Sequence, residues 1–236
     1  MKKAIREIIS QMENVQSGYL AKLQFYYSNL CVTADPLALL STRVRDEDGE
    51  PRHIEDVAYT GRPDDYHFEI IPKDKKLLPE LVEGIKREHP EFDFEIIRAE
   101  YDRRIDPEDD EEAHIIYTMP EVDKNRHDVM IQTVNTLYDG CKETMTAVKT
   151  YYLTKLTTAI IGYEKEEAEE AKKAFEKKDE NLQKIRDGYK ENKTNEIEEA
   201  YKAYQEKEQK KEQEKQEDKA AKGDDILNSL NLNAED

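Results

Sequence analysis

The sequence predicts an α+β protein in which a three-helix bundle is interrupted by a small inserted α/β domain with a mainly antiparallel sheet. Three observations predict it. Apolar residues recur every three or four positions near both ends of the chain and every second position in the middle. Of the 236 residues, 39% are charged and only 8 are Gly and 8 Pro, a composition typical of long helices. The formal net charge of −18 is unevenly spread, and the sign changes coincide with the changes in spacing.

The first thirty residues predict a helix that packs against other helices. Their apolar positions follow intervals of three and four: Ile5, Ile8, Met12, Val15, Tyr19, Leu23, Tyr26 and Leu30. Asp35-Pro36 ends this element, because Pro has no N–H to donate and restricts the residue before it. Residues 1–35 are therefore assigned to the bundle domain, and residues 1–30 carry a net charge of +2.

Residues 36–118 are assigned to the inserted sheet domain, with roughly four or five strands and one helix. Alternating residues predict its strands: Tyr66, Phe68 and Ile70; then Phe92, Phe94 and Ile96; then Ala113, Ile115 and Tyr117. Helical spacing returns only at residues 77–85, before Pro90. Such alternation indicates an antiparallel sheet with one wet face. Residues 43–112 hold 24 acidic and 12 basic residues, so this domain is strongly acidic.

Residues 119–215 supply the other two helices of the bundle. The first shows a long apolar seam: Met130, Val134, Leu137, Cys141, Met145, Val148, Tyr152, Leu156 and Ala159. Gly162 is a plausible C-terminal cap. The next helix begins near Glu164 and has a thinner seam: Ala168, Ala171, Phe175, Leu182, Ile185, Tyr189, Ile197, Tyr201 and Tyr204. Residues 205–222 lack a seam, which predicts either a solvated single helix or disorder, and residues 216–236 are assigned to an acidic, disordered tail.

Composition and motifs argue against several functional classes. No apolar run is long enough for a membrane span, the start lacks a secretion signal, and two cysteines form no disulfide framework, so a cytoplasmic protein is expected. The negative charge argues against DNA binding. Catalytic, phosphate-binding and zinc motifs are missing, and Cys31 and Cys141 fit a core better than a nucleophile. We expect no enzymatic activity, no cofactor and no metal.

Several segments together resemble the ribosome recycling factor family in order and spacing. They are Thr33-Ala34-Asp35-Pro36, Tyr66-His-Phe-Glu-Ile70, Ile115-Ile-Tyr-Thr-Met-Pro120 followed by Arg126, and Leu182-Gln183-Lys184-Ile185 followed by Tyr189. The resemblance spans nearly the whole chain, to about residue 210. It implies a two-domain, L-shaped protein that does no chemistry of its own. It also implies that the bundle contacts large-subunit RNA at the intersubunit face of the bacterial ribosome, and that elongation factor G is a partner. A monomer is expected.

The sequence departs from the family where RNA would be held. The arginine-rich hinge of the family corresponds here to residues 30–34, which carry no positive charge. The three arginines of its middle helix fall on Thr146, Lys149 and Thr150, and Lys offers a point charge where Arg offers a planar fork. Val122 replaces a capping Thr, although Asp123 can cap instead.

Two sets of candidate binding residues follow. The candidate RNA-binding residues are basic and lie along the first two long helices: Lys149, Arg126, Lys142, Lys155 and Lys22. A merely solvated face explains them equally well. Tyr26-Tyr27 and Tyr151-Tyr152 are either stacking platforms for bases or core residues.

The candidate protein-docking patch is acidic and belongs to the insert: Asp109, Asp110, Glu111 and Glu112. Its run of acids lacks the ligand spacing of a calcium loop, and a solvated loop is the plain explanation.

Two functions remain open. The first is a non-enzymatic, ribosome-binding factor of the recycling type, acting in translation termination and recycling. The alternative is a structural or interaction protein with the same fold that has lost ribosomal RNA binding and uses its acidic insert to bind basic protein partners.

Overall fold

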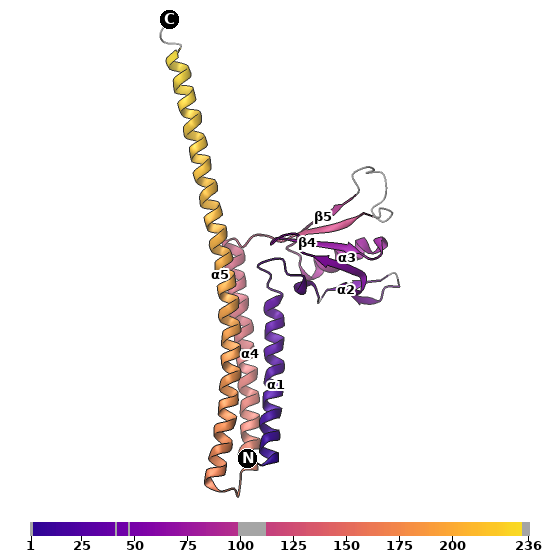
Figure 1. Ribbon diagram of the computed structural model, residues 1–236, viewed down its shortest axis with the longest axis vertical. Coiled ribbons are helices and arrows are strands. Elements are labelled where there is room, and N and C mark those ends of the chain that lie inside the picture. The colour runs from indigo at the N-terminus through magenta and orange to yellow at the C-terminus, as the bar shows by residue number, and fades with distance from the viewer. Residues whose placement is uncertain (1, 41, 47, 99–111, 233–236) are drawn as a thin grey trace.

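The computed structural model describes residues 2–40, 42–46, 48–98 and 112–232, with side chains up to residue 214. Three helices form the bundle: α1 (Lys3–Ser28), α4 (Lys124–Ala159) and α5 (Lys165–Leu232). They pack side by side, and the sheet domain projects sideways from one end of the bundle, which gives the molecule an L shape (Figure 1). The predicted fold class, a helical bundle with an inserted sheet domain, is confirmed. The domain boundaries stay a prediction.

The ends of the helices follow from local sequence. The Asp123 side chain accepts a hydrogen bond from the Arg126 N–H, at 2.8 Å, and so caps α4 as expected. Gly162, between α4 and α5, has a φ of +83°, a conformation that glycine adopts without a steric penalty. Gly162 therefore favours the reversal of the chain between Ala159 and Lys165.

The buried face of α1 is rotated relative to its predicted apolar seam. Val15 and Tyr26, which the spacing placed on the seam, are exposed. The buried positions are instead Ile5, Ile9, Met12, Gln16, Leu20, Leu23 and Tyr27. The cause is Gln16, a polar residue whose side chain is hydrogen-bonded inside the bundle and which an apolar pattern passes over. On α5 the predicted Ile185 is likewise exposed, while its neighbour Arg186 is buried.

The inserted domain contains two small antiparallel sheets in its described residues. Strands β1 (Arg43–Arg45) and β2 (Pro51–His53) form a hairpin. The larger sheet has the order β3-β4-β6-β5, and its strands are Ala58–Gly61, His67–Pro72, His114–Thr118 and Asp93–Ile97 respectively. The short helix α2 (Ile54–Val57) precedes β3, and α3 (Leu78–Glu88) lies near the sheet (Figure 1). One-turn 3-10 helices span Pro36–Leu39 and Lys75–Leu77.

The core of this domain lies between α3 and one face of the sheet. Phe68, Ile70, Ile115 and Tyr117 point inward from the two central strands and are completely buried. The buried Tyr117 hydroxyl donates to the Val82 carbonyl of α3, at 3.1 Å. This arrangement agrees with the alternation that predicted β4 and β6, with one buried and one wet face.

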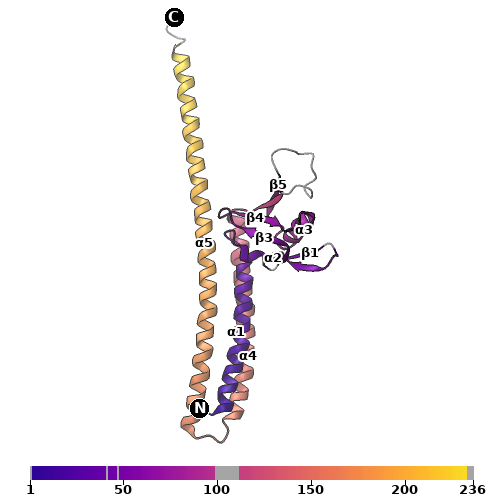
Figure 2. The ribbon, with the colours of Figure 1, turned by 45° about the vertical axis from the view of Figure 1, so that its right-hand side comes forward.

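The end of α5 differs from the prediction for the tail. Residues 216–232, expected to be disordered, continue α5 as a helix that extends beyond the sheet domain (Figure 2). Residues 205–222 are rich in Lys, Glu, Gln and Ala, which all favour the helix, and they contain neither Gly nor Pro. The alternative of a solvated single helix therefore describes residues 205–222 better than disorder.

Candidate functional site

Lys149, the first of the predicted RNA-binding residues, is 34% exposed and forms an ion pair with Asp179 of α5. Its Nζ lies 2.6 Å from Asp179 Oδ2, and the Asp179 side chain is only 2% exposed. Gln16 Nε2 and Gln183 Nε2 also donate to Asp179, at 3.0 and 2.6 Å. Lys149 therefore balances a buried carboxylate, and a phosphate would have to compete with that carboxylate for the same ammonium group.

Arg126 contacts both linkers between the bundle and the sheet domain. These linkers, residues 29–35 and 119–123, form a region that we call the elbow. Its Nη2 donates to the Cys31 carbonyl at 2.8 Å, and its Nη1 donates to the Pro120 carbonyl. Burial lowers the pKa of Arg126 while the nearby Glu91 carboxylate opposes that shift, and the guanidinium stays charged. This side chain thus contacts both linkers through two hydrogen bonds within the protein.

The remaining three candidate lysines are exposed, and Lys142 lies on a different side of the bundle from Lys22 and Lys155. Lys22 Nζ is 5.6 Å from the centroid of the Tyr26 ring, and Lys155 Nζ is 4.5 Å from that of Tyr151. Lys142 lies on the side of α4 that faces α5, where its charge lowers the pKa of Asp187 together with closer groups. The five predicted residues therefore do not form one continuous basic stripe.

Each tyrosine pair contains one packed and one exposed ring. Tyr27 is buried and donates to the Val134 carbonyl at 3.0 Å, and burial raises its pKa to about 12. Tyr152 packs partly buried against the core near the end of α4. Tyr26 and Tyr151 are exposed instead. The core explanation therefore holds for one member of each pair, and the other member remains accessible.

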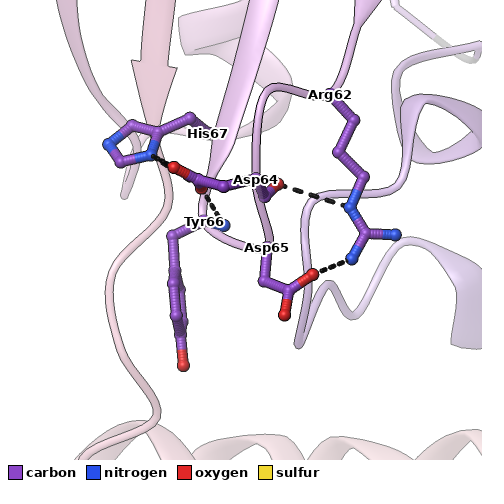
Figure 3. Close-up of polar contacts among 5 residues, drawn as sticks. All are labelled: Arg62, Asp64, Asp65, Tyr66 and His67. Atoms are coloured by element: carbon purple, nitrogen blue, oxygen red, sulfur yellow. Dashed lines mark hydrogen bonds and ion pairs between the residues drawn. The ribbon is translucent and has the colours of Figure 1, made fainter.

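The turn between β3 and β4 fixes the sheet domain to the elbow (Figure 3). Asp64 Oδ1 accepts from the Tyr66 N–H at 2.7 Å, and His67 Nδ1 lies 2.7 Å from Asp64 Oδ2. These contacts lower the pKa of Asp64, the backbone bond contributing most. Arg62 pairs with Asp65 on the other side of the turn.

This ordered turn presents two carbonyls to the linkers. The Asp65 carbonyl accepts from the Ala34 N–H, and the Tyr66 carbonyl accepts from the Met119 N–H, both at 2.8 Å. On the bundle side, Lys207 of α5 pairs with Glu121. The elbow is thus held by Arg126, by the β3–β4 turn and by α5.

The acidic docking patch lies mostly outside the described residues. This applies to Asp109, Asp110 and Glu111. The backbone carbonyl oxygen of Glu112 lies 2.9 Å from Nδ1 of His114, the first residue of β6. Among the described acidic turns, Asp46 is paired with Arg52 Nε at 2.9 Å.

Both thiols are unsuited to nucleophilic chemistry. Burial raises the pKa of Cys31 to about 11 and also raises the pKa of Cys141, so both remain protonated at neutral pH. Within the described ranges, no group of three or more His, Cys, Asp or Glu side chains is placed to hold a metal ion. Over the same ranges, no helix is both long and apolar enough to cross a membrane.

Sequence reasoning missed a row of polar residues in the bundle interior. Asp179, Arg186 and Lys193 of α5 are buried at intervals of seven residues. Arg186 stacks on Tyr138, 4.9 Å from its ring centroid, and pairs with Asp187, while Lys193 pairs with Glu196. The seven-residue spacing could have revealed this row, because residues seven positions apart share a helix face.

Comparison with known proteins identifies the fold. The sequence matches no protein-family model and no curated protein. A solution structure of ribosome recycling factor is similar, with a TM-score of 0.64 and 13% identity, covering 84% of this chain and 100% of that chain. So is a chain from models of the T. thermophilus ribosome recycling factor and the E. coli elongation factor G bound to the E. coli post-termination complex, with a TM-score of 0.53 and 17% identity over 82% and 98% of the chains. The chain has the fold of these proteins.

Proposed function

We propose that this protein binds the ribosome through its helical bundle and acts in translation termination and recycling, in the cytoplasm and without chemistry of its own. The observation that supports this most is the extent of the structural similarity, which includes the whole of a ribosome recycling factor, bundle and inserted domain together. A shared helix pair would recur in many unrelated proteins. An interrupted three-helix bundle with a side-mounted sheet domain is far more specific.

The two domains divide the contacts under this proposal. The bundle, with Lys22 and Lys155 exposed, meets large-subunit RNA. The sheet domain carries the acidic excess, which repels phosphate and attracts basic protein surfaces. We propose elongation factor G as the protein that meets this domain, because that factor stands beside a recycling factor in one of the similar structures.

Sedimentation with ribosomes through a sucrose gradient tests the proposal. The full chain should migrate with ribosomes at low salt and be released between about 50 and 200 mM salt, since each phosphate contact adds to the salt dependence. A protein that stays at the top of the gradient at low salt would exclude ribosome binding.

A second function is favoured by the contacts of the basic residues. Lys149 is paired with Asp179, Arg126 is used at the elbow, and the hydroxyls of Thr146 and Thr150 donate back to helix carbonyls. Under this alternative the chain is an interaction protein that has lost RNA binding and docks basic protein partners on its acidic insert.

Neutralising the patch tests the alternative. The variant carries Asp109→Asn, Asp110→Asn, Glu111→Gln and Glu112→Gln, and its matched control carries four neutral substitutions on α5: Glu169→Gln, Glu170→Gln, Glu176→Gln and Glu180→Gln. Partners captured from lysate are identified at matched salt. Loss of basic partners from the patch variant alone supports the alternative. Equal capture by wild type and patch variant reduces the insert to a solubilising surface.

A further inference from the structure

A shallow groove of about 210 Å³ lies between α1 and α4 and is lined by those two helices alone. Its lining is apolar and hydroxyl-bearing, with a single charged group: Tyr19, Lys22, Leu23, Tyr26, Thr136, Leu137, Gly140, Cys141 and Thr144. None of these nine residues is Asp or Glu, in a chain that has 55 acidic residues. Of the two carboxylates on this part of α4, Asp139 projects away from the groove at 100° per residue, whereas Glu143 lies at its edge, about 20° around the helix from Thr136.

The same face continues along α4 toward the far end of the bundle. Tyr151 and Lys155 follow Thr144 by seven and eleven residues, which is two and three helical turns, so they lie on the groove side. Residues 144–163 contain Lys149 and Lys155 and no carboxylate. Because Lys149 is turned toward Asp179, Lys155 supplies the positive charge on this part of the face.

Each end of this face carries an exposed tyrosine with a lysine beside it. Tyr26 is 38% exposed and Tyr151 is 56% exposed. Lys22 Nζ lies 5.6 Å from the Tyr26 centroid, and Lys155 Nζ lies 4.5 Å from the Tyr151 centroid. An accessible aromatic ring next to an ammonium group matches a base joined to its phosphate.

The two tyrosine–lysine pairs are separated along the bundle axis. Gln16 donates to the Met145 carbonyl, so these residues are level on the antiparallel helices. Tyr26 lies ten residues from Gln16 toward the elbow, and Tyr151 lies six residues from Met145 in the opposite direction. At 1.5 Å per residue the pairs are about 24 Å apart along one face.

We propose that this α1/α4 face binds unpaired RNA, with Tyr26 and Tyr151 stacking on bases and Lys22 and Lys155 contacting phosphates. Stacking requires free base faces, which a duplex hides, and two lysines are too few to hold a duplex by its backbone alone. The face is distinct from the arginine-cluster positions of the recycling factor family, since Thr146 lies about 200° around α4 from Thr144. The proposal rests on the proposed function only for the source of the RNA, which would be an unpaired segment of ribosomal RNA.

The test measures fluorescence anisotropy with an unpaired poly(U) oligonucleotide of about 16 nucleotides, and with a duplex RNA of equal length. Tyr26→Leu and Tyr151→Leu keep apolar bulk but remove the aromatic face, and each should weaken poly(U) binding at least about fivefold. The matched control is Tyr59→Leu. Tyr59 is a 65% exposed tyrosine with Lys73 Nζ 5.1 Å from its ring centroid, but it belongs to the sheet domain. The Tyr59→Leu variant should therefore bind poly(U) as wild type does.

The lysines are tested through salt dependence. Lys22→Gln and Lys155→Gln should each lower the slope of log affinity against log salt by about 0.7, the value for one phosphate contact on a single strand. Lys172→Gln removes an exposed lysine of α5 instead and should leave the slope unchanged. Unfolding curves in urea confirm that every variant folds.

The outcomes separate this proposal from the proposed function. Equal affinity for duplex and poly(U), or leucine variants that bind like wild type, would overturn it, even if the protein still sediments with ribosomes. Tyrosine-dependent poly(U) binding by a protein that ignores ribosomes would support the RNA-binding face and remove the recycling role. A third outcome is that wild type binds neither poly(U) nor duplex RNA while the leucine variants no longer sediment with ribosomes. That result would assign the face to contact with a ribosomal protein and would also overturn the proposal.

Discussion

Lys149 and Asp179 form an ion pair between α4 and α5, with 2.6 Å between Nζ and Oδ2. Asp179 also accepts hydrogen bonds from Gln16 of α1 and Gln183 of α5, so one carboxylate joins all three helices of the bundle. A residue that the sequence predicted to bind RNA thus makes a structural contact in this chain.

Replacing Lys149 should therefore destabilise the fold. Lys149→Met leaves the buried Asp179 carboxylate without its cationic partner, which is strongly unfavourable. We therefore expect the free energy of unfolding, measured by urea denaturation, to fall by about 2–4 kcal/mol. The double variant that carries both Lys149→Met and Asp179→Leu should regain most of the lost stability, since it leaves no unpaired buried charge. A single variant as stable as wild type would show that Asp179 does not need Lys149.

Arg126 should control the order of the elbow. Arg126→Lys keeps the charge but loses the fork that reaches the Cys31 and Pro120 carbonyls together. We expect faster hydrogen exchange at the amides of Ala34 and Met119, which hold the linkers to the β3–β4 turn. Arg87→Lys, at an exposed pair with Glu83, is the matched control. Unchanged exchange at both amides would place the elbow's restraint elsewhere.

His127 should make the contact between α4 and α5 near the elbow dependent on pH. Burial disfavours its charged form, but hydrogen bonds with Asp128 and Glu198 outweigh this, and its pKa is raised above 6.5. Its Nε2 lies 3.1 Å from Glu198 Oε1, and its ring stacks on Tyr201. A raised pKa means that the stabilisation is complete below pH 6.5 and is lost as the pH rises through the folded-state pKa.

The difference in unfolding free energy between wild type and His127→Gln measures this contribution. It should be about 0.5–1 kcal/mol larger at pH 5.5 than at pH 8.5, the range for an ion pair that water can reach. A difference that is independent of pH, or larger at pH 8.5, would contradict the assignment.

Val134 should tolerate no charge. It is fully buried with Leu23, Met130 and Ile197, and its carbonyl accepts from Tyr27. Val134→Asp buries a carboxylate with no partner, so we expect a loss of more than about 3 kcal/mol and early thermal unfolding by circular dichroism. Val129→Asp is the control, because Val129 is exposed on the same helix. Similar melting of the two variants would be inconsistent with this core.

The architecture could be predicted because the spacing of apolar residues distinguishes a helix from a strand when the segment is long enough to show several repeats. The strands near residues 68, 94 and 115 and the helices of the bundle were expected at those places. The short elements β2, β3 and α2 were not located, because three or four residues such as Pro51–His53 show no period.

The buried polar contacts and the site were less predictable. Val15 was preferred over Gln16 because the apolar pattern cannot show that Asp179, 163 positions away, satisfies the glutamine. The same limit applied to Lys149, whose role depends on a partner on another helix. The basic residues were identified by their type, but only the packing shows which are neutralised and that Lys22 and Lys155 are paired with tyrosines.

Competition for the large ribosomal subunit tests the central claim most directly. Fluorescently labelled protein is bound to purified large subunits at low salt, and an authentic ribosome recycling factor is titrated against it. Ribosome binding through a shared bundle site predicts that the labelled protein is displaced in proportion to the competitor. No binding to the subunit, or binding that the competitor leaves unchanged at saturation, would contradict the proposed function.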